Sequence, residues 1–197
     1  MIRTYTEEEM LSLYKRRLGL FEARTGGIVG RQDGNHLDEY LLTEMRAWYA
    51  NLLRTADVGL LPVEDLSSEI DSSLYVDNAT AEISLPARGI RLVSIKFKEW
   101  KQEMRFFYTP ESEMAQMQKN YYLRATTRNP IVVVDRDKLI AYGVSRPTVD
   151  IDPSTPEIAS ATPQITPMKK SVEKLLMIAE PTDGTYRFDD SLLLTIH

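Results

Sequence analysis

Apolar and polar residues alternate along one stretch of this sequence, Arg91-Leu92-Val93-Ser94-Ile95-Lys96-Phe97-Lys98. Successive side chains of a β-strand point to opposite faces of its sheet, so this period of two predicts a strand. Val93, Ile95 and Phe97 would lie on the buried face, while the lysines would meet water. We therefore expect an antiparallel sheet with one solvated face here, and residues 102–108 are expected to return as the hairpin partner.

The residues before this stretch have a helical period instead. Apolar residues recur every three or four positions over residues 10–21 and again over residues 37–56, which is the spacing of one helix face. Thr6 and Glu9 form a capping-box pattern at the start of the first helix, predicted over residues 7–24. Because neither helix can bury its apolar stripe alone, we expect an antiparallel pair, joined by the glycine-rich residues 25–34.

The residues after the stretch continue the β pattern. Two apolar runs at 131–134 and 139–142 flank a short charged turn, which predicts a hairpin. A short helix over about 111–119 follows the helix-start pattern Thr109-Pro110. Further strands are predicted at 74–76, 81–85 and 172–178, and the type of the last element, 186–196, is left open.

Residues 145–168 follow neither pattern, and they contain five of the ten prolines. Such a composition favours an extended arm or an exposed loop. The predicted fold class is therefore α+β. An N-terminal antiparallel helical pair occupies residues 1–66, an antiparallel β domain occupies residues 67–144 and 169–197, and the proline-rich arm occupies residues 145–168.

Composition excludes several classes of protein. The 197 residues include no cysteine, so disulfides and cysteine-bound zinc are excluded. The net charge of −5 argues against a general affinity for the nucleic-acid backbone. No apolar run is long enough to span a bilayer, and the first residues do not resemble a signal peptide. We therefore expect a protein without a membrane partner, made in a cytoplasm or in a particle assembled there.

Few residues suit catalysis. The two histidines are His36, in a predicted helix cap, and His197, the last residue. No phosphate-binding loop and no nucleophile elbow occur, so we expect neither enzymatic activity nor a cofactor. The acidic pairs Asp135/Asp137 and Asp150/Asp152 could hold Mg²⁺ or Mn²⁺, which keeps a metal-dependent enzyme as a third hypothesis, although turn and arm positions explain these pairs better.

An alternative function is a nucleic-acid-binding module built on residues 91–108. Basic residues beside aromatic rings on a sheet can bind single strands through charge and stacking. Glu99 and Glu103 dilute the charge of this segment, which favours a structural interpretation. The residues concerned are Arg91, Lys96, Phe97, Lys98, Trp100, Lys101, Arg105, Phe106, Phe107 and Tyr108.

Three segments, taken in order after the two helices, carry a resemblance to a known family. They are Ile83-Ser84-Leu85-Pro86-Ala87-Arg88-Gly89-Ile90-Arg91-Leu92, then Asn129–Val134 with Lys138–Tyr142, and then Val172–Pro181 followed by Phe188-Asp189-Asp190. This order of segments resembles that in the neck, or head–tail adaptor (connector), proteins of short-tailed bacteriophages. The general character of the sequence resembles the crAss-like group of these phages. The resemblance covers most of residues 1–144 and 169–197. The proline-rich arm departs from the family, which usually has a short connection there, and so does the chain end, where the family often has a longer helix.

The resemblance implies a virion structural protein in the phage neck, assembled in the host cytoplasm. Such proteins form a ring, most often of twelve copies, between the portal protein and the tail, around the conduit through which DNA is ejected. The implied partners are further copies of the chain, the portal protein and other neck or tail proteins, with DNA passing through without sequence-specific binding. The family has no catalytic residues, so none are transferred.

Two sets of residues in this chain are candidates for contacts in such an assembly. Aromatic residues on the predicted helical pair exceed what that pair must bury, so we expect a subunit or portal interface there. Its candidate residues are Phe21, Tyr40, Trp48 and Tyr49. In the arm, Ile151, Ile158 and Ile165 are spaced seven apart and are candidate anchors for docking on a partner.

Overall fold

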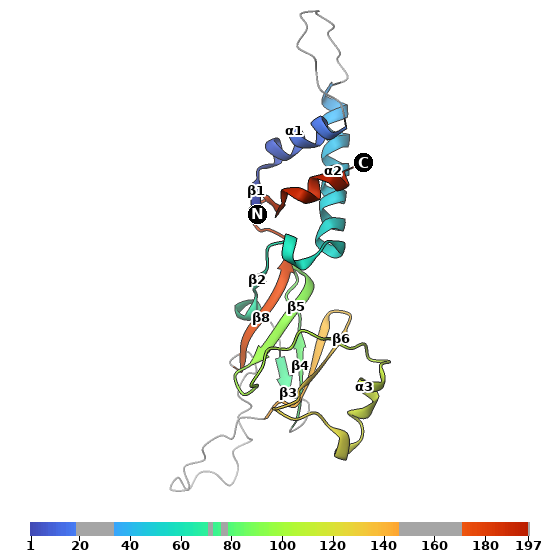
Figure 1. Cartoon of the computed structure of the whole chain (residues 1–197), viewed down its shortest axis with the longest axis vertical. Coiled ribbons are helices and arrows are strands. Elements are labelled where there is room, and N and C mark those ends of the chain that lie inside the picture. The colour runs from blue at the N-terminus through green and yellow to red at the C-terminus, as the bar shows by residue number, and fades with distance from the viewer. Residues whose placement is uncertain (19–33, 71–72, 76–78, 146–170, 197) are drawn as a thin grey trace, which may run out of the picture. The chain divides into compact units, whose positions relative to one another are not determined.

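The computed structural model of the chain describes residues 1–18, 34–70, 73–75, 79–145 and 171–196 (Figure 1). These residues form two compact units. Unit 1 comprises Met1–Glu64 and Ile178–His197, and unit 2 comprises Asp65–Met177. Helices and antiparallel sheets are both present, which confirms the α+β class predicted from the two periods. No helix within the described ranges has the length and apolar character needed to cross a membrane.

Unit 1 contains the two long helices, α1 (Glu7–Arg17) and α2 (Gly34–Thr55). The predicted capping box is present, because the Thr6 hydroxyl accepts a hydrogen bond from the Glu9 amide at 3.3 Å and the Glu9 carboxylate accepts one from the Thr6 amide at 2.9 Å. These two bonds satisfy amide groups that an open helix end would leave unpaired. The described part of α1 ends at Arg17, and residues 19–33 lie outside the described part of the chain.

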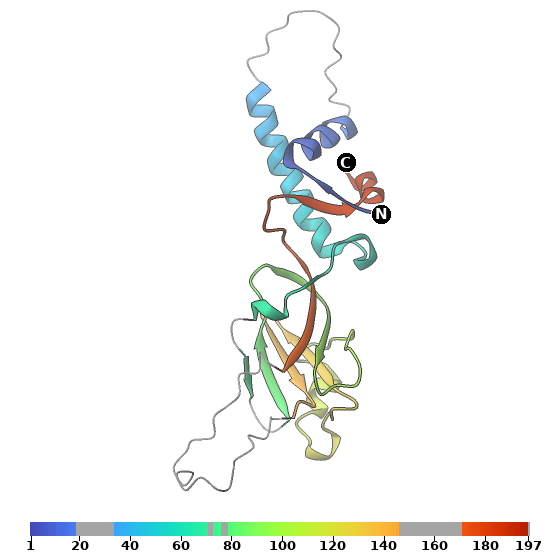
Figure 2. The same cartoon turned by 90° about the vertical axis from the view of Figure 1, so that its left-hand side faces the viewer.

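The two helices pack side by side and run in opposite directions (Figures 1 and 2). Glu7, at the start of α1, pairs with Arg46 at 2.6 Å. Lys15, near the end of α1, pairs with Asp38 at 2.6 Å, two turns earlier along α2. The buried side chains Met10 and Tyr14 of α1 and Leu41 and Met45 of α2 belong to the core of this unit.

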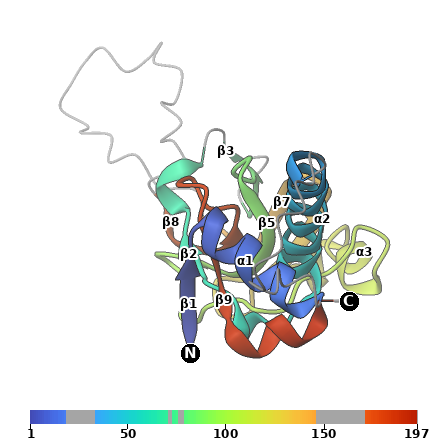
Figure 3. The same ribbon diagram turned by 90° about the horizontal axis from the view of Figure 1, so that it is seen from above.

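The C-terminal residues also belong to unit 1. Strand β9 (Tyr186–Asp189) pairs antiparallel with β1 (Ile2–Tyr5), so that Ile2 lies opposite Asp189 and Tyr5 opposite Tyr186. The 3-10 helix η6 (Asp190–Thr195) follows β9, and Figure 3 shows β1 and β9 in the view from above. Ile178–His197 thus group with the N-terminal helices, whereas the sequence pattern predicted that all of residues 169–197 belong to the β domain. The reason is that β1, the partner of β9, is too short to be recognised by a period of two.

Two sheets account for the remaining strands. One has the strand order β2 (Glu64–Asp65), β8 (Val172–Ala179), β5 (Gly89–Phe97). The other, which is antiparallel throughout, has the order β3 (Ser73–Tyr75), β4 (Thr80–Ser84), β7 (Lys138–Tyr142), β6 (Ile131–Asp135). The predicted hairpin over residues 131–142 is confirmed as β6 and β7, joined by a two-residue turn.

Short elements complete the described chain. In unit 2 these are α3 (Glu113–Met117), η2 (Ser67–Glu69) and η3 (Tyr121–Leu123), while η1 (Val58–Leu60) lies in unit 1. The helix predicted over 111–119 is therefore shorter than expected. The predicted return hairpin over residues 102–108 is reduced to one antiparallel bridge, in which Met104 and Ile95 of β5 exchange backbone hydrogen bonds at 3.0 and 2.9 Å, while Tyr108 forms a parallel bridge to Val133.

The four-stranded sheet has two unequal faces, which its register defines. Residues directly opposite each other in an antiparallel sheet point to the same face. On one face Ala81, Ile83, Val132, Leu139 and Ala141 are fully buried, and Val134 at its edge is partly buried. The residues of β4, β6 and β7 on the other face are Thr80, Glu82, Ser84, Ile131, Val133, Asp135, Lys138, Ile140 and Tyr142. Ala115 of α3 packs against Ile131 and Val133 on this second face, where Ile140 and Tyr142 are only partly buried.

Candidate interaction surfaces

Tyr49, one of the four aromatic residues expected at a subunit interface, is buried inside unit 1. Only 6% of its surface is exposed, and its ring meets Tyr186 edge-on with the ring centres 4.9 Å apart. Its hydroxyl accepts a hydrogen bond from the Arg187 amide at 3.1 Å and donates one to the Arg187 carbonyl at 3.4 Å. Tyr49 therefore holds β9 against α2 within its own chain, which leaves little of its surface for the expected contact with another subunit.

Trp48 and Tyr40 differ from Tyr49 and from each other. Trp48 is partly buried, with its ring edge-on to Phe188 and its indole N–H donating to the Thr195 hydroxyl at 3.2 Å. Tyr40 is 61% exposed, and Leu37, one helical turn earlier, is 46% exposed. Leu37 and Tyr40 therefore form an exposed apolar surface on the first turns of α2, which we call the α2 surface. Phe21 lies outside the described residues.

The predicted arm lies almost wholly outside the described residues, including Ile151, Ile158 and Ile165. The two residues that border it are described, and both are held at the end of β5. The Ser145 amide donates to the Glu99 carboxylate at 3.0 Å, and the Lys98 amide donates to the Ser171 carbonyl at 2.9 Å. Burial raises the pKa of the Glu99 carboxyl, and the hydrogen bond from Ser145 opposes this effect. Ser145 and Ser171 therefore lie at neighbouring points.

A pocket of about 480 Å³ opens on the second face of the four-stranded sheet. Its floor is formed by Val133, Ile140 and Tyr142, and its walls come from α3 and the loop that follows. We call it the α3 pocket. Its lining residues are Thr80, Pro110, Ala115, Gln116, Gln118, Lys119, Arg124, Val133, Ile140 and Tyr142.

The wall of the α3 pocket is positioned by local hydrogen bonds. The Ser112 hydroxyl caps α3 by accepting from the Ala115 amide at 3.3 Å. Gln118 is 3% exposed, and its amide group donates to the Met114 carbonyl at 3.0 Å and accepts from the Ala125 amide at 2.8 Å. Both polar ends of this buried side chain are thus satisfied, which fixes the end of α3 relative to the loop carrying Arg124.

No pattern in the sequence predicts this pocket. Its floor and walls come from four separate segments, and no local period marks a half-covered sheet face. A partial signal was present in the α3 segment itself. Its apolar residues Met114, Ala115 and Met117 are too few to cover four strands and are interrupted by the polar Gln116.

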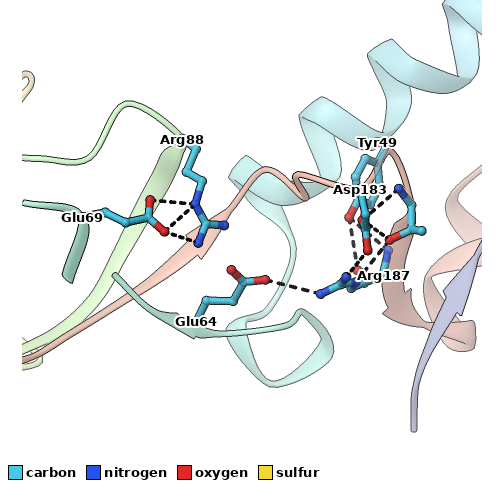
Figure 4. Close-up of polar contacts among 7 residues, drawn as sticks. Tyr49, Glu64, Glu69, Arg88, Asp183 and Arg187 are labelled. Carbon is cyan, nitrogen blue, oxygen red and sulfur yellow. Dashed lines mark hydrogen bonds and ion pairs between the residues drawn. The ribbon is translucent and has the colours of Figure 1, made fainter. Parts of the chain in front are cut away.

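Strong ion pairs elsewhere in the chain are structural (Figure 4). In unit 2, Arg88 forms a two-pronged pair with Glu69 at 2.6 and 2.8 Å, and this contact lowers the pKa of the Glu69 carboxyl. In unit 1, the Thr185 hydroxyl donates to Asp183 at 2.6 Å, and Arg187 pairs with the same carboxylate. The Thr185 bond is the largest cause that lowers the pKa of Asp183 to about 2. These carboxylates fasten strands and turns.

Two of the five aromatic residues in the basic and aromatic segment 91–108 are buried. Phe97 and Trp100 are 0% and 2% exposed and pack against each other with ring centres 4.6 Å apart. Lys96 pairs with Glu173 at 2.9 Å. Phe106 is exposed, yet a platform for successive bases needs several accessible rings. Phe97 and Trp100 are therefore unavailable for stacking, whereas Phe107 and Tyr108 are partly exposed, and the nucleic-acid alternative stays a prediction.

The acidic pairs occupy turns and caps in the parts of the chain that the structure describes. Asp135 borders the β6–β7 turn and Asp137 lies within it. Asp189 caps η6 by accepting from the Ser191 amide at 3.0 Å. Among the described residues, no three His, Asp or Glu side chains gather as a metal site would require. Asp150, Asp152 and the side chain of His36 lie outside this description.

Comparisons with protein-family models, with curated proteins and with solved structures give no match for this chain.

Proposed function

We propose that this chain is a structural protein of a phage virion that forms a ring in the neck, between the portal protein and the tail. The observation that carries the proposal is the resemblance of three ordered sequence segments to neck adaptor proteins of short-tailed phages. In the structure, the first segment spans the turn from β4 into β5, the second forms the β6–β7 hairpin, and the third includes β8 and the end of β9.

The α2 surface supports this proposal. A ring needs apolar groups that remain exposed on the single chain, and Leu37 and Tyr40 meet this condition whereas Tyr49 does not. The net charge of −5 also suits a conduit, because an acidic wall does not retain the DNA that slides through it. Under this proposal the finer arrangement is a helical pair that contacts neighbours, a β domain, and a proline-rich arm over residues 145–168 that becomes ordered on a partner.

An electron-microscopy map of the native particle tests the proposal. We expect several copies of this chain in one closed ring that touches the portal protein. One copy per particle, or a position outside any ring, would contradict the proposal.

The α2 surface gives the same proposal a mutational test. Tyr40→Glu should reduce incorporation of the chain into particles, because it places a charge in an apolar contact. Tyr122→Glu is the matched control, since Tyr122 is 91% exposed and lies in unit 2. Quantitative mass spectrometry of purified particles measures both variants. Equal incorporation of the two variants would show that Tyr40 does not lie in a subunit interface.

A further inference from the structure

The α3 pocket lies where one face of the four-stranded sheet is only partly covered. Ala115 of α3 packs over Ile131 and Val133 of β6. On the neighbouring strand β7, Ile140 and Tyr142 line the pocket and keep part of their surface exposed. The floor of the pocket is therefore apolar, and its volume of about 480 Å³ is typical of sites that bind small molecules.

The wall of the pocket is basic. Lys119 and Arg124 are exposed there, and among the described residues that line the pocket none is acidic. The Gln116 side chain donates to the Pro110 carbonyl at 3.0 Å and accepts from the Lys119 ammonium at 2.6 Å, which positions this ammonium on the wall. An ammonium has three N–H donors, so Lys119 can bind an anion without giving up Gln116. The wall therefore favours a negatively charged group.

A buried hydroxyl belongs to the same pocket. Thr80 of β4 is only 7% exposed, lies opposite Tyr142 in the register and lines the pocket. Within the described ranges of the chain, no group forms a hydrogen bond with its hydroxyl. A buried polar group normally has such a partner, because leaving it unpaired is unfavourable. The Thr80 hydroxyl therefore indicates a polar partner that enters the pocket.

These three features match one class of ligand. The apolar floor favours a hydrocarbon body, the basic wall favours an anionic head group, and the hydroxyl offers that head group a hydrogen bond. A simple inorganic anion would leave the floor uncovered. A neutral hydrocarbon would make no use of the wall or of the hydroxyl. The ligand that uses all three is both apolar and anionic.

We propose that the α3 pocket binds a small amphipathic anion. Its hydrocarbon body lies on Ile140 and Tyr142. Its carboxylate or phosphate head group contacts Lys119, Arg124 and the Thr80 hydroxyl. All of these residues belong to unit 2 of a single chain, so the site goes beyond the proposed role in a ring and does not depend on it.

Methyl NMR of the full-length protein tests this proposal. The probes are decanoate and decyl phosphate, which join the same hydrocarbon chain to a carboxylate and to a phosphate. We expect a saturable shift of the Ile140 methyl signals, with a dissociation constant on the order of 100 µM from the affinity that ligands of this size reach per atom. Ile83, buried on the opposite face of the sheet, is the internal reference and should not respond. A response to only one probe would support the proposal and identify the head group, whereas no response to either would overturn it.

Two simpler probes show whether both parts of the pocket take part. Decanol lacks the charge and should bind about tenfold more weakly than decanoate, because the charge-assisted hydrogen bonds are lost. Inorganic phosphate lacks the hydrocarbon and should leave the Ile140 signals unchanged at the same concentrations. Equal affinities for decanol and decanoate, or an equal response to inorganic phosphate, would overturn the assignment of an amphipathic anion.

Paired variants assign the effect of charge to the pocket wall. Lys119→Gln together with Arg124→Gln should weaken decanoate binding about tenfold and leave decanol binding unchanged, which also shows that the pocket is still formed. The matched control is Lys101→Gln together with Arg128→Gln. It changes the net charge equally at two exposed residues that do not line the pocket, and should leave both affinities unchanged. Equal weakening by the two pairs would indicate a general charge effect and overturn the proposed site.

Thr80→Val removes the hydroxyl and keeps the shape of the side chain. Decanoate should bind about threefold to tenfold more weakly, because the head group loses one hydrogen bond. The midpoint of thermal unfolding of the free protein should not fall, since this hydroxyl has no partner to lose among the described residues. An unchanged affinity for decanoate, or a lower midpoint, would overturn the contact assigned to Thr80.

Discussion

At the scale of single residues, Trp100 has two roles in unit 2. Its ring packs against Phe97, and its indole N–H donates to the Gly143 carbonyl at 2.9 Å in a buried position. Gly143 itself has a φ of +82°, and a Cβ there would lie 2.5 Å from the Thr126 carbonyl oxygen. Only glycine suits this point, so the chain leaving β7 is fixed both by its backbone conformation and by the indole.

Replacing Trp100 by phenylalanine should lower the free energy of unfolding by about 2–3 kcal/mol, because the substitution leaves a buried carbonyl unpaired and removes ring volume. Trp48→Phe is the matched control. The indole of Trp48 donates to Thr195 in an exposed position, so we expect a loss of only about 0.5–1 kcal/mol. Urea unfolding of both variants measures the difference, and equal losses would contradict the assigned role of the Trp100 bond.

At the scale of elements, the β6–β7 hairpin carries backbone strain at its turn. Arg136 has a φ of +54°, a left-handed conformation that is unfavourable for any residue with a Cβ. Arg136→Gly should therefore raise the free energy of unfolding by about 0.5–1 kcal/mol, after allowance for the greater freedom of glycine in the unfolded chain. Asp137→Gly is the control. Asp137 has no positive φ, so glycine at this position should lower the stability of the fold. Thermal unfolding of the two variants should shift the midpoint in opposite directions.

The turn before β9 gives a pH-dependent prediction. The folded pKa of Asp183 is about 2, below its ordinary value of 3.8, so the charged carboxylate stabilises the fold. This contribution is present above the ordinary value and is lost as the pH falls through about 2. Thr185→Val removes the hydroxyl whose hydrogen bond contributes most to the lowered pKa of Asp183. We expect the pKa of Asp183, followed by carbon NMR, to rise towards 3.8 in this variant. A pKa that stayed near 2 would assign the effect to Arg187 instead.

At the scale of the whole molecule, each unit has its own buried aromatic residue. Phe188 in unit 1 and Phe97 in unit 2 are both 0% exposed. Phe188 contacts the rings of Tyr5, Trp48 and Tyr49, so it joins β1, α2 and β9. These two positions allow the units to be perturbed separately.

Phe188→Ala and Phe97→Ala should each lower the free energy of unfolding by about 3–5 kcal/mol. The first substitution should weaken unit 1 and the second should weaken unit 2. Hydrogen exchange should show loss of amide protection over α1 and α2 in the first variant and over β4 to β7 in the second. If either substitution exposed both sets of amides equally, the division into two units would not describe the unfolding of this protein.

The sequence by itself determined the elements whose pattern is local. The capping box, the two helices and the β6–β7 hairpin follow from periods and turn residues within short windows, because each records which face of an element is buried. The order of the segments also carried the resemblance on which the proposed function rests.

Only the tertiary structure decided which apolar residues remain exposed. Tyr40 and Tyr49 lie on the same helix, yet β9, from the far end of the chain, covers Tyr49. The α3 pocket likewise depends on how far a helix of five residues covers a sheet. Such contacts join segments that are distant in sequence, and burial depends on what packs against a residue as well as on its own chemistry. A local pattern can therefore predict that a face is apolar, but not which element will cover it.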